Sequence, residues 1–325
     1  MKKCNIGGQA VLEGVMMKAP DRVAIAVRRA DGEIEVVKQS SKPLKDRHKI
    51  LGVPIIRGMV AFFETMVIGI KTLMLSAELY GDEELDDYKP SKFESFLSEK
   101  MGKDIEDVMI GTALVLALLF AVLLFVVIPT TVTSFLGRSI ESDVVMNLIE
   151  GVIRLAIFII YIVLISRIED IRRVFEYHGA EHKTIHCYEH GEELTVQNAR
   201  KYTTLHPRCG TAFLLIVMVI SIVVFSFLGW QGIFMRILTR MLLLPFISGI
   251  SYEVIRWAGR SESNLVNIIM YPGLMLQKLT TKEPDDEQLE VAIRAFLAAT
   301  ECDGDRVDEI EAKSDESCEY SPVEV

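Results

Sequence analysis

Four long apolar runs dominate the residue pattern of this 325-residue chain, each with about 20 largely apolar residues, the length at which a helix crosses a bilayer. These runs occupy 108–134, 145–166, 211–230 and 237–257. The first carries no charge, whereas Arg240 and Pro245 interrupt the last. Glu150 and Arg154 in the second run are four residues apart, so they can pair on one helix face. The pattern predicts a mostly α-helical integral membrane protein with about four transmembrane helices.

The N-terminal segment has a different pattern. Two short segments rich in apolar residues, 22–27 and 33–37, flank Asp31 and Gly32, a pair typical of a tight hairpin turn. Together with the segment around Gly7 and Gly8, this pattern predicts a small β-rich piece ahead of the membrane helices.

Residues 55–77 are apolar but carry Arg57, Glu64 and Lys71, whose spacing of seven places them along one helical face. We expect a helix that lies in the membrane interface. A fifth span is the alternative, and it would move the 11 basic residues before position 50 to the other side of the membrane.

The rest of the pattern divides the chain into segments. An acidic linker at 81–90 precedes a capping box that opens a helix at Ser91, and another amphipathic helix follows at 285–299. The predicted organisation is a β-rich segment at 1–54, interfacial helices and linker at 55–107, a membrane domain at 108–257 with a histidine-rich loop at 167–210, amphipathic helices at 258–300, and a disordered acidic tail at 301–325.

Composition and charge agree with a membrane protein whose main partner is the lipid bilayer. The chain is 50% hydrophobic with a mean hydropathy of +0.31, which soluble domains rarely reach. The net charge of −10 is concentrated in the tail, where ten acidic residues face two basic ones, so nothing favours nucleic-acid binding.

Lysine and arginine counts predict the orientation. Residues 1–107 carry 17 and residues 167–211 carry seven, whereas loops 137–144 and 229–236 carry one each. Both termini and the histidine-rich loop should therefore be cytoplasmic. The five cysteines, which show no paired spacing, would then lie in a reducing compartment.

The stretch YHGAEHKTIHCYEHGE at 177–192 holds four of the six histidines. The second apolar run leads straight into this stretch, and if its helix continues, His178 and His182 are one turn apart and can reach one metal ion. The word H-x-x-E-H is also the inverted zinc-protease motif, in which the acid, here Glu181, is the base for a metal-bound water. Glu189 shares this face, His186 lies at its edge and Cys187 points away. A polar, solvated helix end is the alternative.

A second word, His206-Pro-Arg-Cys209-Gly, resembles a metal knuckle and lies just before the third apolar run. A turn into a membrane helix is the alternative. If the second and third spans are antiparallel neighbours, both words lie at one membrane depth. His178, His182, His206 and Cys209 then form a ligand set that suits Zn²⁺. His186, Cys187 and Glu189 are secondary candidates, as is Glu13 in the glycine-flanked run at 6–17, whose alternative is a solvated hairpin edge.

Three words together resemble the YqhQ family of bacterial membrane proteins: GGQAVLEGVMM at 7–17, YHGAEHK at 177–183 and HPRCGT at 206–211. The resemblance covers roughly residues 3–300. It implies a multi-pass protein of the bacterial cytoplasmic membrane and a predicted metal-dependent enzyme. Carried over, the family words fall on Gly7, Gly8, Gln9, Glu13, His178, Glu181, His182, His206 and Cys209.

Three functions remain open at this point. The first is a metal-dependent hydrolase at the cytoplasmic interface with Glu181 as catalytic base, which requires an open metal position. The second is a non-catalytic scaffold or regulator, in which the metal clips two spans together and a membrane protein is the partner. The third is a transporter, motivated by the charged residues within the apolar runs.

Overall fold

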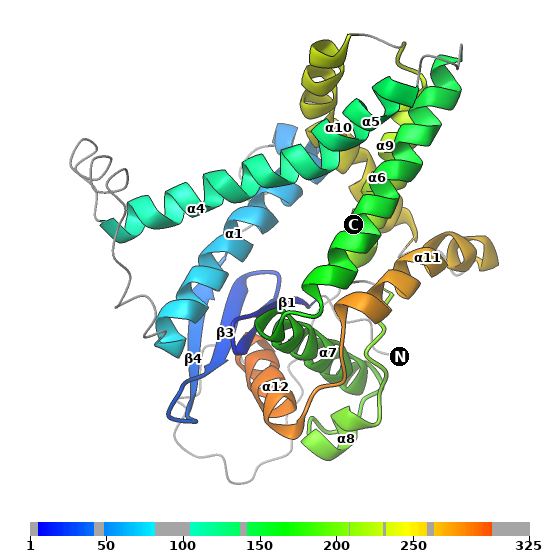
Figure 1. Ribbon diagram of the computed structural model, residues 1–325. Helices are drawn as coiled ribbons and strands as arrows, with labels where there is room; N and C mark the ends of the chain where they lie inside the picture. The colour runs from blue at the N-terminus through cyan, green and yellow to red at the C-terminus, as the bar shows by residue number, and fades with distance from the viewer. Residues whose placement is uncertain are drawn as a thin grey trace.

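The computed structural model describes residues 6–41, 49–81, 105–136, 142–207, 209–229, 232–258 and 263–300. It contains an N-terminal sheet and a set of long helices (Figure 1). The helix expected from Ser91, most of the acidic linker and the acidic tail lie outside the described residues. The expected fold class, mostly helical with a small N-terminal β-rich part, is confirmed.

The sheet is a four-stranded antiparallel meander. Its strands are β1 (Gly7–Val11), β2 (Gly14–Lys18), β3 (Arg22–Arg28) and β4 (Ile34–Ser40), in the order β1-β2-β3-β4. The hairpin predicted around Asp31-Gly32 is present as β3–β4, with Arg28 opposite Ile34. Gly32 has a φ of 89°, a conformation that glycine adopts without steric cost.

The two faces of the sheet are covered by different helices. Successive strand residues point to opposite faces, so Met17, Ala24 and their neighbours pack against α7 (Glu169–Glu189) and α12 (Asp286–Thr300). The opposite face, with Met16 and Ile25, packs against α1 (Ile56–Tyr80). The sheet is therefore enclosed between α1 on one side and α7 with α12 on the other (Figure 1).

Four helices within the described residues are long and apolar enough to cross a membrane: 56–80, 108–135, 143–165 and 233–258. Three of them coincide with predicted spans. They are formed by α4 (Ile105–Val122) with α5 (Ile128–Leu136), by α6 (Asp143–Ile165), and by α10 (Ile233–Ala258). The remaining predicted span is the shorter apolar helix α9 (Gly210–Ser226), which lies alongside α6 (Figure 1).

A π-helical turn, η3 (Leu123–Val127), joins α4 to α5. Pro129 follows it and has no N–H to donate to the Phe125 carbonyl, four residues earlier. Arg154 Nε of α6 donates to that carbonyl instead, at 2.9 Å. The proline thus leaves one backbone carbonyl inside the helix bundle without its usual helical donor, and an arginine from the neighbouring helix donates to it.

Glu150 is the centre of a buried polar cluster between the apolar helices. It pairs with Arg154 at 3.0 Å, as the sequence predicts, and also with Arg240 and, at 3.8 Å, Arg236. The Thr130 hydroxyl donates to the same carboxylate at 2.9 Å. The cluster joins α5, α6 and α10, and its arginines are buried inside the bundle.

The second span does not continue straight into the histidine stretch. α6 ends at Ile165, residues 166–168 turn, and α7 begins at Glu169 (Figure 1). The break lets α7 leave the bundle and pack against the sheet. The short helices η2 (Lys49–Gly52) and α8 (Val196–Arg200), together with α11 (Asn264–Thr280), complete the described elements. α11 packs on α9, where Gly273 meets Ala212.

Candidate metal centre

α7 presents two imidazoles side by side. His178 and His182 are one helical turn apart, and their ring centroids lie 4.5 Å from each other. Gly179 between them faces the Lys282 carbonyl, where a Cβ would overlap the backbone. The glycine of the word HGAEH therefore lets α7 approach the segment after α11 closely.

The second word of the sequence meets the first in space. Cys209 caps the N-terminus of α9, and its Sγ accepts from the Thr211 N–H at 3.4 Å. The same sulfur lies 3.1 Å from His178 Nε2. One ligand atom from each of His178, His182 and Cys209 lies within 4.8 Å of the other two. Two words about 30 positions apart thus form one group of nitrogen and sulfur ligands.

Backbone carbonyls orient both imidazoles of this group. His178 Nδ1 donates to the Thr280 carbonyl at 2.9 Å, and His182 Nδ1 donates to the Thr204 carbonyl at 2.5 Å. These bonds leave the Nε2 lone pairs free to bind a cation, an arrangement that most metal-ligating histidines share. Burial also holds the pKa of His182 well below the usual histidine range, so the ring is neutral near pH 7, as a ligand must be.

Glu181 lies beside this group and is 5% exposed. The backbone N–H of Gly8 in β1 donates to its carboxylate, and a Cβ on Gly8 would lie 2.7 Å from Glu181 Cδ. Its Oε2 has no hydrogen-bond partner among the described residues. Burial raises the pKa of Glu181 to about 7, and the Cys209 thiol adds to this rise, while His178 and the Gly8 N–H oppose it.

His206 lies with a different set of neighbours. One ligand atom from each of His186, Glu189 and His206 lies within 4.8 Å of the other two, and His206 Nε2 is 3.5 Å from Glu189 Oε2. The structure therefore divides the predicted four-ligand set between two adjacent groups. The His182 and His206 rings still lie close, with centroids 5.6 Å apart.

Buried Gln277 of α11 fixes the position of His206. Its Oε1 accepts from the His206 backbone N–H and its Nε2 donates to the His206 carbonyl, both at 2.8 Å. Burial and, to a smaller extent, the nearby His186 together lower the pKa of His206 to about 4. Sequence reasoning did not find Gln277, because a single glutamine in an amphipathic helix carries no signal of such a contact.

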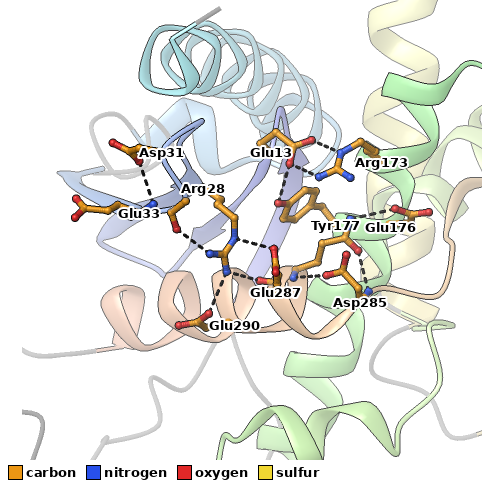
Figure 2. A network of polar contacts seen from close by, with 12 residues as sticks. Glu13, Arg28, Asp31, Glu33, Arg173, Glu176, Tyr177, Asp285, Glu287 and Glu290 are labelled. Carbon is orange, nitrogen blue, oxygen red and sulfur yellow. Dashed lines mark hydrogen bonds and ion pairs between the residues drawn. The ribbon is translucent and has the colours of Figure 1, made fainter.

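Two other candidates have different surroundings. Glu13, in the turn between β1 and β2 with a φ of 46°, is buried and accepts two hydrogen bonds from Arg173, both at 2.5 Å (Figure 2). The Tyr177 hydroxyl donates to the same carboxylate at 3.1 Å. Cys187 is in the core under the sheet, with its Sγ 3.4 Å from the Glu193 carbonyl. Neither residue belongs to a ligand group.

Figure 2 shows how the sheet is attached to the helices around this centre. Arg28 of β3 donates to the Glu290 carboxylate of α12 at 3.0 Å. Gln288 reaches the Glu176 carboxylate of α7 at 3.1 Å and also caps α12 reciprocally with Asp285. These contacts attach β3 to α12 and α12 to α7, the helix that carries Glu181.

The first group has the chemistry and spacing of a zinc site. A nitrogen and a sulfur bound to one tetrahedral zinc lie about 3.5 Å apart, close to the 3.1 Å between His178 Nε2 and Cys209 Sγ. Three protein ligands leave one position open, which is typical of catalytic rather than structural zinc. The unsatisfied Oε2 of Glu181 is a further buried polar atom that needs a partner at this place.

Fold and site together define a multi-helix protein of the membrane type with a histidine–cysteine cluster beside a small sheet. Residues 53–302 match the model of a family described as "Protein of unknown function (DUF1385)", so the chain belongs to this family. It is also 35% identical over 293 residues to the Uncharacterized protein YqhQ of Bacillus subtilis (strain 168), covering 89% of this chain and 90% of that protein. No solved structure matches the chain. The predicted resemblance is confirmed.

Proposed function

We propose that this protein is a zinc-dependent hydrolase of the bacterial cytoplasmic membrane, with His178, His182 and Cys209 as metal ligands and Glu181 as the base. One observation carries the proposal. Three ligand atoms lie within 4.8 Å of one another, next to a buried carboxylate whose Oε2 has no hydrogen-bond partner among the described residues.

Each residue has a separate part in this chemistry. When bound, a zinc ion with three protein ligands supplies Lewis acidity and makes water a nucleophile at neutral pH. Glu181 would serve as the general base and acid, accepting a proton from the attacking water and passing it to the leaving group. The Thr280 and Thr204 carbonyls hold the two imidazoles in orientation. Gly8 keeps the Glu181 carboxylate in place with its N–H.

A structural metal clip is the second candidate, because the site is enclosed. His182 is only 1% exposed, and the group joins α7 to the start of α9 and the end of α11. A clip would make the protein a scaffold or regulator for a membrane-protein partner, and Glu181 would then only assist the ligands.

Cobalt substitution separates these two candidates without knowledge of the substrate. Cobalt(II)-loaded protein is titrated with acetohydroxamate while the ligand-field bands are recorded. A hydrolytic site with an open position changes its spectrum, whereas unchanged bands at saturating acetohydroxamate indicate a closed clip. Glu181→Gln should keep the bound metal and lower turnover of a fluorogenic peptide or ester by about 10²–10⁴-fold. Equal turnover in the variant would rule out Glu181 as the base.

Contacts between distant parts of the chain support one arrangement of the helices in the membrane. The sheet precedes α1 and α7 follows α6, yet both contribute to one core and are joined by the Glu13–Arg173 pair. Both therefore lie on the same side of the membrane. An even number of crossings must separate them, so α1, the α4–α5 run and α6 cannot all cross.

We infer that α1 is the helix that does not cross. Its residues Ile68, Leu75 and Leu79 pack on the sheet, while Phe63 and Val67 are exposed and face outward. A helix with a sheet on one side and an apolar face on the other fits the membrane surface. In this arrangement α9 and α10 provide the two crossings between α7 and α12, and the basic-residue counts favour a cytoplasmic location for the sheet and both termini.

Reporter fusions test this topology. A green fluorescent protein fused to the C-terminus should fluoresce in cells, and alkaline phosphatase at the same place should be inactive. Phosphatase fused after α5, within 137–141, should be active because that loop would be outside. An active phosphatase at the C-terminus, or an inactive one within 137–141, would contradict this topology. Either result would leave the proposal of a metal site untouched.

A further inference from the structure

A second group of metal-ligating side chains lies on the same helix and is not used by the site proposed above. His186 and Glu189 lie about one and two turns beyond His182 on α7, and His206 joins them from the loop before α9. Glu189 and His206 are both buried. Two imidazoles and a carboxylate are a common zinc ligand set.

The spacing within this group suits a shared cation. An oxygen and a nitrogen bound to one tetrahedral zinc lie about 3.4 Å apart, and Glu189 Oε2 is 3.5 Å from His206 Nε2. The His186 and His206 rings are 4.7 Å apart between centroids. His186 Nε2 donates to the Leu205 carbonyl at 2.9 Å, which fixes the ring as backbone carbonyls fix the rings of the first group.

The two groups are neighbours but do not merge. With a rise of 1.5 Å per residue, the midpoint of His178 and His182 is about 11 Å along the axis of α7 from that of His186 and Glu189. This separation exceeds the ~4 Å between metals that share a bridging ligand. The contact between the groups is made by the His182 and His206 rings.

We propose that His186, Glu189 and His206 bind a second zinc ion, separate from the first. His206 and Cys209 belong to one loop, so a cation at His206 holds that loop against α7 and positions the Cys209 thiolate for the first site. The proposal extends the metal centre of the proposed function, but it does not require that centre to be catalytic.

Metal counting tests the second site. The full chain is purified in detergent, loaded with zinc, dialysed, and analysed by mass spectrometry for zinc per protein. Wild type should hold two ions and Glu189→Gln or His186→Gln one. His190→Ala is the matched control, because His190 is exposed, lies one turn beyond His186 and is in neither group; it should hold two.

Cobalt spectra show which ion is lost. Cys209→Ser should lose the thiolate-to-cobalt charge-transfer band and keep one ion, whereas Glu189→Gln should keep the band and bind the remaining ion about 10–100-fold more weakly. If the wild type holds a single ion and Glu189→Gln holds the same number, the second site is overturned and the first is retained. Two ions retained in Glu189→Gln also overturn it, and no zinc in wild type overturns both. Size-exclusion profiles identify a variant that fails to fold. If Glu189→Gln fails to fold, the zinc content of His186→Gln tests the second site in its place.

Discussion

Gly8 shows at the scale of one residue how the sheet and the candidate centre depend on each other. A Cβ at this position would lie 2.7–2.8 Å from three atoms of Glu181, whereas a Cβ on neighbouring Gly7 would meet nothing within 4 Å. We expect Gly8→Ala to destabilise the protein by about 1–3 kcal/mol through overpacking and to displace the Glu181 carboxylate. Gly7→Ala is the matched control. Thermal unfolding in detergent measures the difference, and equal midpoints for the two variants would contradict this account.

Glu13 is a secondary ligand candidate in the sequence, but in the structure it stabilises the fold. Its buried carboxylate binds Arg173 and Tyr177, and it lies outside both ligand groups. Glu13→Gln should therefore lower stability by about 1–3 kcal/mol, the range for hydrogen bonds to a charged group, because Arg173 is partly exposed and water compensates in part. Zinc content should stay at the wild-type value. A loss of zinc without a loss of stability would assign Glu13 to the metal centre instead.

At this scale the sequence marks candidate ligands, but it does not predict how the structure divides them into two groups. Helical spacing alone brings His178 and His182 together, and the knuckle-like word marks Cys209. The separation of His206 from Cys209 depends on the position of the His206 backbone, which Gln277 fixes from α11, far along the chain. The carbonyls of Thr204 and Thr280 are backbone groups, and side-chain identity does not predict them.

At the scale of elements, the Glu150 cluster connects the apolar helices. One carboxylate faces the guanidinium groups of Arg154, Arg236 and Arg240 in a buried position. Glu150→Gln leaves these positive charges without their counter-ion, which should cost about 3–5 kcal/mol. The expected result is a clear drop in the unfolding midpoint in detergent. Ser226→Ala is the control, since that hydroxyl bonds back to the Val223 carbonyl of its own helix. An unchanged midpoint in Glu150→Gln would show that the cluster contributes little.

The elements themselves were largely predictable. Apolar runs located the α4–α5 run, α6 and α10, and the Asp31-Gly32 turn located the β3–β4 hairpin. The break between α6 and α7 was not foreseen, because Ser166-Arg167-Ile168 contains neither glycine nor proline. The sequence also predicts an apolar helix at 55–77, but its periodicity does not reveal that one face of α1 packs on the sheet, because a buried face and a lipid-facing one are both apolar.

At the scale of the whole molecule, metal removal tests whether the centre holds its parts together. The first ligand group joins α7 to the start of α9, and backbone bonds extend it to the end of α11. A ligand at 100 times its dissociation constant stabilises the folded state by about 2.7 kcal/mol. Dialysis against a chelator should therefore lower the unfolding midpoint by several degrees, and added zinc should restore it. Cys209→Ser, which loses the first ion and can keep only the second, should show a smaller shift under the same treatment.

X-ray absorption at the zinc edge tests the central claim most directly, namely that the words HGAEH and HPRC meet around one cation. The account predicts a sulfur shell at about 2.3 Å together with nitrogen or oxygen at about 2.0–2.1 Å in the wild-type protein. It also predicts that Cys209→Ser loses the sulfur shell. Zinc bound without any sulfur scatterer, or a sulfur shell that persists in Cys209→Ser, would contradict it.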